Sequence, residues 1–409
     1  MTIEIQPGRA FGTVQAPPSK SMAHRMLLCA GLAHGESRIE GIGQSEDVSA
    51  TVDCLTACGA EVVRIAPETV TVRGFDALHA VPLKPLCCRE SGSTLRFFVP
   101  VCLLGGTEVT FTGAPSLLSR PLGVYETLCR ERGLTYEQTA GLLRMRGPLT
   151  PGEFRVPGNI SSQFISGLLF ALPLLASDSS VVLTTPVESK SYIDLTLRAL
   201  SLFGAEAAWK GERMLQIPGG QRYRPANVRV EGDYSNAAFF EALNLFGGSV
   251  TVTGLSPDSL QGDRVYVRFF HMLEQGTPTI HLSDCPDLAP VLFAVAAAKN
   301  GGVFTGTRRL KLKESDRAEA MAQELRKFGT AVTVHEDAVV VFPKEFHRPA
   351  ETLFGHNDHR IVMALSVLLS LTGGSIEGAQ AAAKSFPDFF DKLRSVGICA
   401  EEKETEDAC

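Results

Sequence analysis

The chain has 409 residues, 44% of them hydrophobic and 21% charged, and its formal net charge at pH 7 is −6. One compact core rarely holds so many residues, so we expect a folded protein of two or three domains. The negative balance excludes a general attraction to nucleic acid or anionic membranes, and no apolar run reaches the roughly 18 residues that span a bilayer. Anionic substrates would therefore need local clusters of Arg and Lys.

The cysteines and the two ends of the chain give further expectations. The ten cysteines form no paired CxxC pattern, and most lie in apolar stretches, so we expect buried free thiols in a reducing cytosol and no metal site. The first segment, MTIEIQPGRAFG, lacks the basic and apolar regions of a signal peptide. The acidic segment 400–409 is expected to be disordered.

A repeated pattern runs along the chain. Helical segments rich in Leu and Ala end in Gly and lead into short β-like runs, with starts mostly about 70 residues apart, which indicates a repeat architecture. The starts are Asp47, Arg120, Ser191, Asp263, Ser315 and Pro387. More apolar helices lie between them, and we expect these to be buried: 23–33, 92–104, 161–176, 235–247, 287–300 and 358–372.

Six such units predict two domains of three units each. The pattern is interrupted in residues 223–240, where a domain boundary is expected. The short N-terminal β-like segment is expected to pair with the C-terminal half, which places a second chain crossing near Pro17 and Pro18. Two crossings between domains would form a hinge.

Polar residues gather where the buried helices begin. The segments are PPSKSMAHRMLL, ESGSTLRFFVP, GNISSQFISGLLF, DCPDLAPVLF and HNDHRIVMAL. Taken singly, each is explained by helix caps and tight turns. Repeats place equivalent helix ends on one face, however, so we expect these N-termini to converge on a site for substrates with several negative charges.

The last of these segments illustrates the expectation. Asp358 is a candidate N-cap for a buried helix. His359 and Arg360 would then point out of the core beside an anion site; the alternative is a capped helix with two solvated side chains.

The segment LKLKESDRAEAMAQ adds candidates for proton transfer. Lys313, Glu314, Asp316 and Arg317 lie at a strand-to-helix junction. The structural alternative is a solvated, capped helix start with Asp316 and Arg317 paired. The functional interpretation is a carboxylate and two cations where phosphate and carboxylate would be bound, an arrangement suited to acid–base chemistry. Walker A, dinucleotide, HExxH and GxSxG motifs are absent, so the chemistry is expected to run without nucleotide, metal or covalent Ser.

Together, these segments resemble the 5-enolpyruvylshikimate-3-phosphate synthase family over nearly the whole chain. The matching motifs, in the family's order, are Ser-Lys-Ser with a following Arg, Ser-Gly-Ser-Thr-x-Arg, Arg-Pro, Ser-Ser-Gln, Ser-x-x-Tyr-Ile-Asp, Cys-Pro-Asp, Lys-Glu-Ser-Asp-Arg, Asn-Asp-His-Arg and Lys-Ser-Phe-Pro-Asp. The resemblance implies an α/β fold of two domains, each an inside-out barrel of three βαβαββ units, around a central interdomain cleft. Domain 1 would comprise residues 1–18 and 229–409, and domain 2 residues 19–228, with a double crossover near 18 and 229.

The resemblance also implies a reaction. The family transfers the enolpyruvyl group of phosphoenolpyruvate to the 5-hydroxyl of shikimate 3-phosphate, by way of a tetrahedral intermediate, and releases phosphate. It implies a cytoplasmic monomer without cofactor, metal, nucleic acid or membrane partner, whose partners are these two small molecules.

Roles follow by matching motifs residue by residue. Asp287 would accept the hydroxyl proton, Glu314 would exchange the proton at C3, and Lys20 would contact both substrates and assist proton transfer. The residues implied to bind shikimate 3-phosphate are Lys20, Ser21, Arg25, Ser161, Ser162, Gln163, Ser189, Tyr192, Asp287 and Lys313. Those implied to bind phosphoenolpyruvate are Lys20, Gly92, Arg120, Gln163, Arg317, His359, Arg360 and Lys384.

Two positions depart from the family's pattern, and two other functions remain open. Glu90 stands where the family usually has Asn, and Arg309 stands where some members use Asn to contact shikimate. One alternative is the sister enzyme that transfers enolpyruvyl to UDP-N-acetylglucosamine, but the stretch APSLLSRP lacks the Cys typical of it. The other is a non-catalytic anion-binding protein, which loss of Lys20, Asp287 or Glu314 would have favoured.

Overall fold

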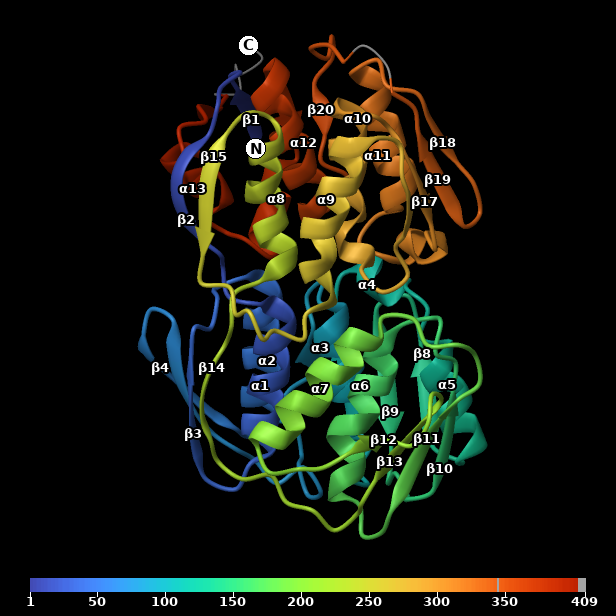
Figure 1. Ribbon diagram of the computed structural model, residues 1–409. Helices are drawn as coiled ribbons and strands as arrows, with labels where there is room; N and C mark the ends of the chain where they lie inside the picture. The colour runs from blue at the N-terminus through green and yellow to red at the C-terminus, as the bar shows by residue number, and fades with distance from the viewer. Residues whose placement is uncertain (344–345, 404–409) are drawn as a thin grey trace, which may run out of the picture. The chain divides into compact units, whose positions relative to one another are not determined.

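The computed structural model describes residues 1–343 and 346–403 (Figure 1). Contacts between residues divide the chain into two compact units. Unit 1 comprises Met1–Pro17 and the residues from Gly232 onward, and unit 2 comprises Pro18–Glu231. The predicted two-domain α/β organisation is therefore confirmed, and the chain crosses between the units twice; the boundaries at 18 and 229 stay a prediction.

Unit 2 alternates strands and helices. Its helices are α1 (Lys20–Leu32), α2 (Glu46–Ala57), α3 (Gly92–Cys102), α4 (Pro115–Leu118), α5 (Gly123–Glu131), α6 (Ser162–Ala171) and α7 (Lys190–Leu202). Its strands are β3 (Glu36–Glu40), β4 (Glu61–Ala66), β5 (Thr69–Arg73), β6 (Leu86–Cys87), β7 (Glu108–Thr112), β8 (Thr135–Gln138), β9 (Leu142–Arg146), β10 (Glu153–Val156), β11 (Ser179–Leu183), β12 (Ala208–Trp209), β13 (Met214–Ile217) and β14 (Asn227–Arg229).

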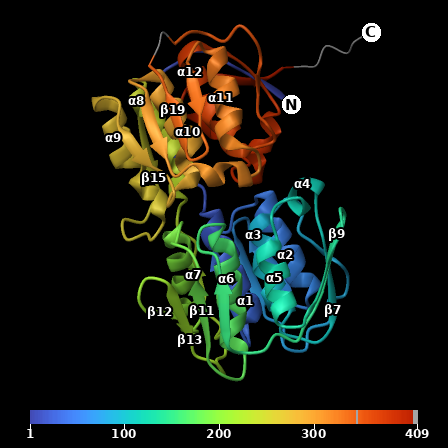
Figure 2. The ribbon, with the colours of Figure 1, turned by 90° about the vertical axis from the view of Figure 1, so that its right-hand side faces the viewer.

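The strands of unit 2 form three separate sheets around its buried helices. Each sheet has four strands, in the orders β14-β3-β5-β4, β6-β7-β9-β8 and β10-β11-β13-β12. In each, the first pair is parallel and the others are antiparallel, as a βαβαββ unit requires. Figures 1 and 2 show α1, α3 and α6 inside unit 2, with strands toward its outside.

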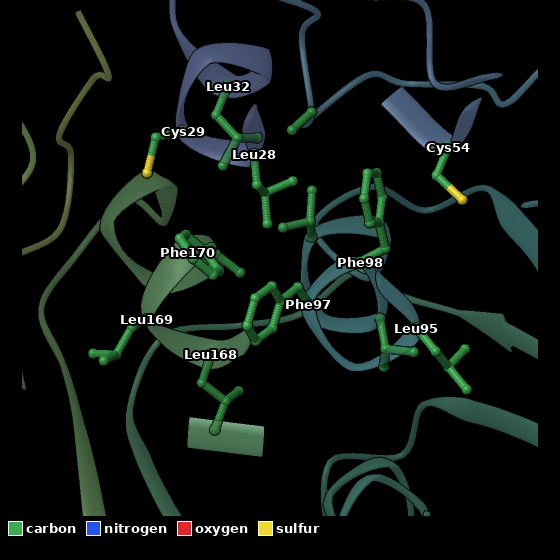
Figure 3. Close-up of a cluster of buried hydrophobic side chains, with 14 of the residues drawn as sticks. Leu28, Cys29, Leu32, Cys54, Leu95, Phe97, Phe98, Leu168, Leu169 and Phe170 are labelled. Carbon is green, nitrogen blue, oxygen red and sulfur yellow. The ribbon is translucent and has the colours of Figure 1, made fainter. Parts of the chain in front are cut away.

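The interior of unit 2 explains why three of its helices are apolar on most faces. Helices α1, α3 and α6 are buried along most of their length, as expected from their sequences. Their side chains meet in one hydrophobic core (Figure 3), where the ring centroids of Phe97 and Phe170 lie 5.1 Å apart. Helices α2, α5 and α7 keep an exposed face, in agreement with the more polar half of each repeat.

Unit 1 follows the same plan with one reduced sheet. Its helices are α8 (Tyr234–Leu245), α9 (Tyr266–Gln275), α10 (Ala289–Ala298), α11 (Arg317–Lys327), α12 (His359–Thr372) and α13 (Phe389–Ser395), with 3-10 helices η3 (Pro286–Leu288), η4 (Arg308–Leu312) and η5 (Ala379–Lys384) among them. Its strands are β1 (Thr2–Ile5), β2 (Phe11–Gln15), β15 (Ser249–Thr253), β16 (Thr279–His281), β17 (Gly302–Thr305), β18 (Val332–Val334), β19 (Ala338–Val341), β20 (Leu353–Phe354), β21 (Gly374–Glu377) and β22 (Ala400–Glu402).

The N-terminal strands belong to the C-terminal half of the chain, as expected. Strand β1 pairs antiparallel with β21 and β22 in a four-stranded sheet, and β2 pairs parallel with β15 in a two-stranded one. The expectation of disorder in segment 400–409 is wrong for residues 400–402, because β22 pairs with β1 there. Residues 404–409 lie outside the described part of the chain.

Polar caps begin most of the buried helices. A side-chain oxygen of the N-cap residue accepts a backbone N–H at α1, α3, α6, α8 and α12, and the caps are Ser19, Ser91, Ser161, Asp233 and Asp358. The cap role predicted for Asp358 is thus confirmed. Among the described helices, none combines the length and apolar character needed to cross a membrane.

Candidate active site

Unit 2 brings several predicted binding residues together around Gly92, at the first turn of α3. A Cβ atom built on Gly92 would lie 2.7 Å from Nη1 of Arg96, 3.2 Å from Nη1 of Arg120 and 3.6 Å from Oε1 of Gln163. We call these four residues the Gly92 cluster. Its members come from three segments of the chain, and glycine is required where side chains crowd the backbone so closely.

Two hydrogen bonds of Gln163 order this cluster. Nη1 of Arg96 donates to Oε1 of Gln163 at 2.6 Å, and Nε2 of Gln163 donates to the hydroxyl of Ser93 at 2.8 Å. The Arg96 guanidinium also lies over the ring of Phe164, 5.1 Å from its centroid. The start of α3 and the start of α6 are therefore linked by side chains that leave cationic groups beside Gly92.

Lys20, at the first position of α1, has an acidic partner. Its Nζ donates to Oδ2 of Asp47 at 2.9 Å, and both side chains are largely covered, with exposed fractions of 14% and 13%. Asp47 lies in the first turn of α2, where a carboxylate is favoured by the helix dipole. The pair holds the ammonium group of Lys20 between the ends of two helices.

Arg25 is buried among neutral acceptors. Its Nη1 donates to the carbonyl of Ser21 at 2.6 Å, its Nη2 donates to the carbonyl of Tyr192 at 2.8 Å, and its Nε donates to Thr196 at 2.8 Å. Only 2% of the residue is exposed, and burial lowers the pKa of Arg25 to about 10. Ser21 and Tyr192, predicted to bind the same substrate as Arg25, thus lie beside its guanidinium, which ties α1 to α7; their binding roles stay a prediction.

The other residues predicted to bind shikimate 3-phosphate lie at the starts of α6 and α7. The hydroxyl of Ser161 accepts the N–H of Gln163 at 3.3 Å, and Ser162 follows as a buried first residue of α6. Ser189 is the N-cap position of α7 and has a left-handed backbone, with φ of 58°. Two successive helix starts with hydroxyl groups form a suitable environment for a phosphate.

Unit 1 concentrates charges around Asp287, which lies in η3. Oδ1 of Asp287 is 2.8 Å from Nη1 of Arg317 and 3.2 Å from Nζ of Lys313, and Oδ2 is 3.0 Å from Nη2 of Arg360. Arg317, only 1% exposed in its side chain, also contacts Oε2 of Glu314 at 2.7 Å. The Asp287 cluster comprises these residues together with Asp358.

Asp358 is the third acidic partner of Arg317. Nε of Arg317 donates to Oδ2 of Asp358 at 2.9 Å, while the other oxygen of Asp358 caps α12 by accepting the N–H of Arg360 at 2.9 Å. One carboxylate thus positions both cations of the cluster. The alternative of a solvated Asp316–Arg317 pair is wrong, since Arg317 is buried and pairs with Asp287, Glu314 and Asp358. Its capped helix start is confirmed, because Asp316 accepts the N–H of Glu319 as the N-cap of α11.

The charges in this cluster determine its protonation. Burial works to raise the pKa of Asp287, but Arg360, Lys313 and Arg317 together outweigh it and hold the pKa of Asp287 well below its usual value. Burial lowers the pKa of Lys313, although Asp287 opposes this. In Arg317 burial is outweighed by the three carboxylates, which raise its pKa. Asp287 and Arg317 are thus both charged near neutral pH.

The start of α12 differs from the expectation in one respect. His359 and Arg360 were expected to point out of the core, but they are 1% and 4% exposed. Besides Asp287, Nη2 of Arg360 donates to the hydroxyl of Ser235 at 3.0 Å. Lys384 lies in η5, and its Nζ donates to the carbonyl of Asn357 at 2.7 Å. Arg360 and Lys384, both predicted to bind phosphoenolpyruvate, therefore lie at the start of α12.

Unusual backbone angles mark the same segments. In the described residues, positive φ outside glycine occurs at Arg89, Ser189, His356 and Asn357, with φ of 51°, 58°, 49° and 51°. Ser189 is the N-cap position of α7, and the other three lie one or two residues before the N-caps of α3 and α12. Left-handed backbone is strained in such residues and concentrates at functional sites, so it supports the same three helix starts.

Comparison with known proteins identifies the family. The family model for EPSP synthase (3-phosphoshikimate 1-carboxyvinyltransferase) matches residues 5–393. The chain is 38% identical to the 3-phosphoshikimate 1-carboxyvinyltransferase of Clostridium kluyveri, covering 97% of each chain, and 38% identical to that of Clostridium perfringens, covering 97% of this chain and 99% of the relative. The chain belongs to the EPSP synthase family.

A solved structure agrees with this fold. The EPSP synthase of Acinetobacter baumannii is 24% identical, with a TM-score of 0.80 over 98% of this chain and all of that one. The family carries out enolpyruvyl transfer in the shikimate pathway, so the chain is an enzyme of aromatic amino acid biosynthesis. The described part of the chain contains no group of His, Cys, Asp and Glu side chains arranged for a metal ion.

Several contacts in this EPSP synthase family member were missed by sequence reasoning. Asp47 begins a noted repeat, and Arg96 closes the Ser-Gly-Ser-Thr-x-Arg motif, but neither was assigned a role beside Lys20 or Gln163. Ser235 was also missed as a partner of Arg360. An acidic first helix turn and an Arg inside an apolar helix were the available signals, since a buried charge needs a partner.

The described cysteines are free, and Cys87 and Cys399 alone among them are exposed.

Proposed function

We propose that the chain transfers the enolpyruvyl group of phosphoenolpyruvate to the 5-hydroxyl of shikimate 3-phosphate, with acid–base chemistry supplied by its own side chains. The hydroxyl oxygen bonds to C2 of phosphoenolpyruvate and loses its proton, while C3 gains one. The tetrahedral intermediate then loses inorganic phosphate and a C3 proton to give the enolpyruvyl ether. The observation that carries this proposal is the Asp287 cluster, where two carboxylates suited to proton transfer share the Arg317 guanidinium.

The proposed catalytic roles belong to three residues. Asp287 accepts the proton of the 5-hydroxyl, and Glu314 exchanges the proton at C3. Lys20 contacts both substrates and assists proton transfer. The roles of Asp287 and Glu314 are supported by the partial exposure of their side chains, 16% and 18%, which leaves them open to a substrate. Both are held in place by the buried guanidinium of Arg317.

The proposed binding roles follow the helix starts. Shikimate 3-phosphate is bound by Lys20, Ser21, Arg25, Ser161, Ser162, Gln163, Ser189, Tyr192, Asp287 and Lys313. Phosphoenolpyruvate is bound by Lys20, Gly92, Arg120, Gln163, Arg317, His359, Arg360 and Lys384. Arg side chains suit these anions because a guanidinium binds carboxylate or phosphate through two parallel hydrogen bonds. Arg309 is left out, since its Nη2 donates to the carbonyl of Ser283 at 2.5 Å.

The reaction is tested by measuring inorganic phosphate released from phosphoenolpyruvate. One sample contains shikimate 3-phosphate and a parallel sample contains UDP-N-acetylglucosamine. We expect release only with shikimate 3-phosphate. Release only with the sugar nucleotide would assign the chain to the sister reaction, and no release with either acceptor would favour an anion-binding protein without activity.

The acid–base roles are tested by Asp287→Asn and Glu314→Gln. We expect either change to lower kcat by about 100-fold or more while shikimate 3-phosphate binding, measured by calorimetry, changes little. Glu319→Gln is the matched control, because this exposed carboxylate lies in the first turn of α11, outside the Asp287 cluster. Unchanged turnover in both test variants would refute the assignment.

Two further features complete the proposal. We expect the enzyme to act as a monomer in the cytoplasm, with no cofactor. Sedimentation at micromolar concentration tests the first expectation, and fractionation of the cells that make it tests the second. A concentration-dependent dimer would contradict the monomer.

A further inference from the structure

A buried chain of hydrogen bonds runs through unit 2 from His24 to the start of α3. Nδ1 of His24 lies 2.7 Å from the hydroxyl of Thr51, which lies 2.8 Å from that of Thr94, which in turn lies 2.7 Å from that of Ser91. None of these four residues is more than 1% exposed. The His24 chain, as we call these residues, joins α1, α2 and the N-cap of α3.

The direction of the hydrogen bonds follows from counting protons. The hydroxyl of Thr94 donates to Ser91, with a longer contact of 3.4 Å to the carbonyl of Asp47, so its oxygen accepts from Thr51. Thr51 has only one hydroxyl proton, so it accepts from His24. The imidazole is therefore protonated on Nδ1, and Nε2 carries the lone pair.

The surroundings of His24 favour this neutral form. In the part of the chain that the structure describes, Nε2 has no hydrogen-bond partner, and the ring meets Phe97 edge-on with centroids 6.5 Å apart. Burial lowers the pKa of His24 to about 3, an effect that Lys20 and Arg25 reinforce and Asp47 opposes. A second proton would have no acceptor in this apolar environment.

The chain ends where the Gly92 cluster begins. Ser91 accepts the backbone N–H of Thr94 at 3.2 Å as the N-cap of α3, and Gly92 is the next residue. Thr51 belongs to α2, which also carries Asp47, the partner of Lys20. A shift of Ser91 would therefore move Gly92 against the guanidinium groups of its cluster, and a shift of α2 would move the partner of Lys20.

We propose that His24, protonated on Nδ1, is a positioning residue that holds Ser91 and the first turn of α3 in register for phosphoenolpyruvate. The inference rests on the proposed function, because that function assigns Gly92 and Arg120 to this substrate. His24 acts through Thr51 and Thr94 and needs no contact with substrate. Position 24 therefore requires one buried N–H group that can donate to the hydroxyl of Thr51 in α2.

Substitutions that differ in this donor test the inference. In His24→Asn the amide nitrogen stands as many bonds from Cα as Nδ1 does, so the donor is kept, whereas His24→Gln carries it one bond farther and His24→Leu lacks it. We expect kcat/KM for phosphoenolpyruvate within about threefold of wild type for H24N, and about 10- to 100-fold lower for H24L, with H24Q between. Binding of shikimate 3-phosphate to the free enzyme should change less than about threefold.

A second pair of variants keeps the test valid if H24L fails to fold. Thr51→Ser retains the hydroxyl and should behave like wild type, whereas Thr51→Val should reproduce the loss of kcat/KM for phosphoenolpyruvate. Met26→Ala, a truncation at a buried position of α1, is the control for loss of stability alone. Normal kinetics in T51V, or an equal loss in M26A and T51V, would overturn the proposal.

The tautomer is measured directly, without reference to activity. Long-range ¹⁵N–¹H correlation spectra of protein labelled on histidine report which ring nitrogen is protonated, and loss of one signal set in H24N identifies His24. Protonation on Nδ1 at neutral pH is expected, and protonation on Nε2 would overturn the inference. If the wild-type protein showed this tautomer but released no phosphate, the proposed function would fail and the hydrogen-bond chain would stand.

Discussion

Substitution of Gly92 by Ala tests how tightly the Gly92 cluster is packed. The added methyl group would lie 2.7 Å from Nη1 of Arg96, whereas ordinary contacts begin near 3.4 Å, so the two groups must separate by about 0.7 Å. Arg96 cannot move alone, because Nη1 is bonded to Gln163 and the guanidinium covers the ring of Phe164. Nη1 of Arg120, at 3.2 Å, must also shift by a few tenths of an ångström.

The size of the effect follows from these displacements. Misplacement of binding groups by about 1 Å costs about 100-fold, so a shift of roughly 0.7 Å predicts a KM for phosphoenolpyruvate about 10- to 100-fold higher, or about 1.4 to 2.7 kcal/mol. Asp287 and Glu314, the proposed acid–base pair, belong to unit 1, whereas Gly92 belongs to unit 2, so kcat should stay within about fivefold. Initial rates of phosphate release, with phosphoenolpyruvate varied at saturating shikimate 3-phosphate, measure both constants.

A matched glycine provides the control. Gly123 begins α5, and a Cβ atom there would meet nothing within 4 Å, so Gly123→Ala should leave both constants unchanged and stabilise the protein slightly. An unchanged KM for phosphoenolpyruvate in G92A would refute the reasoning, because it would show that Arg96 and Arg120 move without cost. A fall in kcat at constant KM would show that Gly92 affects the chemical step instead.

Three more predictions concern stability and reactivity. His24 has a pKa near 6.5 in the unfolded chain but about 3 in the native protein, so the free energy of unfolding should fall as the pH falls. His24→Asn should reduce the slope of unfolding free energy against pH by about 1.4 kcal/mol per pH unit between pH 4 and 6. Equal slopes for the two proteins in urea titrations would contradict this. Arg317→Met leaves three carboxylates without their buried cation, so it should destabilise the protein by about 3 to 5 kcal/mol at pH 7 and by a smaller amount at pH 5. A loss of unfolding free energy below about 1 kcal/mol, measured by chemical unfolding at pH 7, would contradict the pairing of Arg317 with these carboxylates. A maleimide should label Cys87 and Cys399 first among the described cysteines, as mapped by mass spectrometry. Early labelling of the buried thiols of unit 2, such as Cys29 and Cys54, would show that this unit opens readily.

Local patterns in the sequence predicted the elements well. The apolar helices at 23–33 and 92–104 correspond to α1 and α3, because helices buried on most faces need apolar residues throughout. The polar residues before them were recognised as caps, since a helix start exposes N–H groups whatever it packs against. The family's motifs also associated Gly92 with Arg120.

Partners distant in the sequence could not be predicted in the same way. The contact of Arg317 with Asp358 spans 41 residues, and that of His24 with Thr51 spans 27. Neither follows a helical or strand spacing, because tertiary packing alone brings these elements together. The strand at 400–402 was missed for a similar reason, since an acidic tail becomes a strand only where a neighbouring strand such as β1 offers its hydrogen bonds.

The ionised state of Asp287 bears on how it can act as a base. Three cations hold its pKa well below the usual value, and a carboxylate in that state is a weak acceptor for a hydroxyl proton. Arg317, Arg360 and Lys313 are also the proposed ligands of anionic substrates. A bound phosphate or carboxylate would compete with Asp287 for their N–H donors, so its pKa should rise when both substrates are present. Because the same cations bind substrate and lower the pKa of Asp287, Asp287 would become a stronger base only when both substrates are bound. Hydrolysis of phosphoenolpyruvate without shikimate 3-phosphate should therefore be slow.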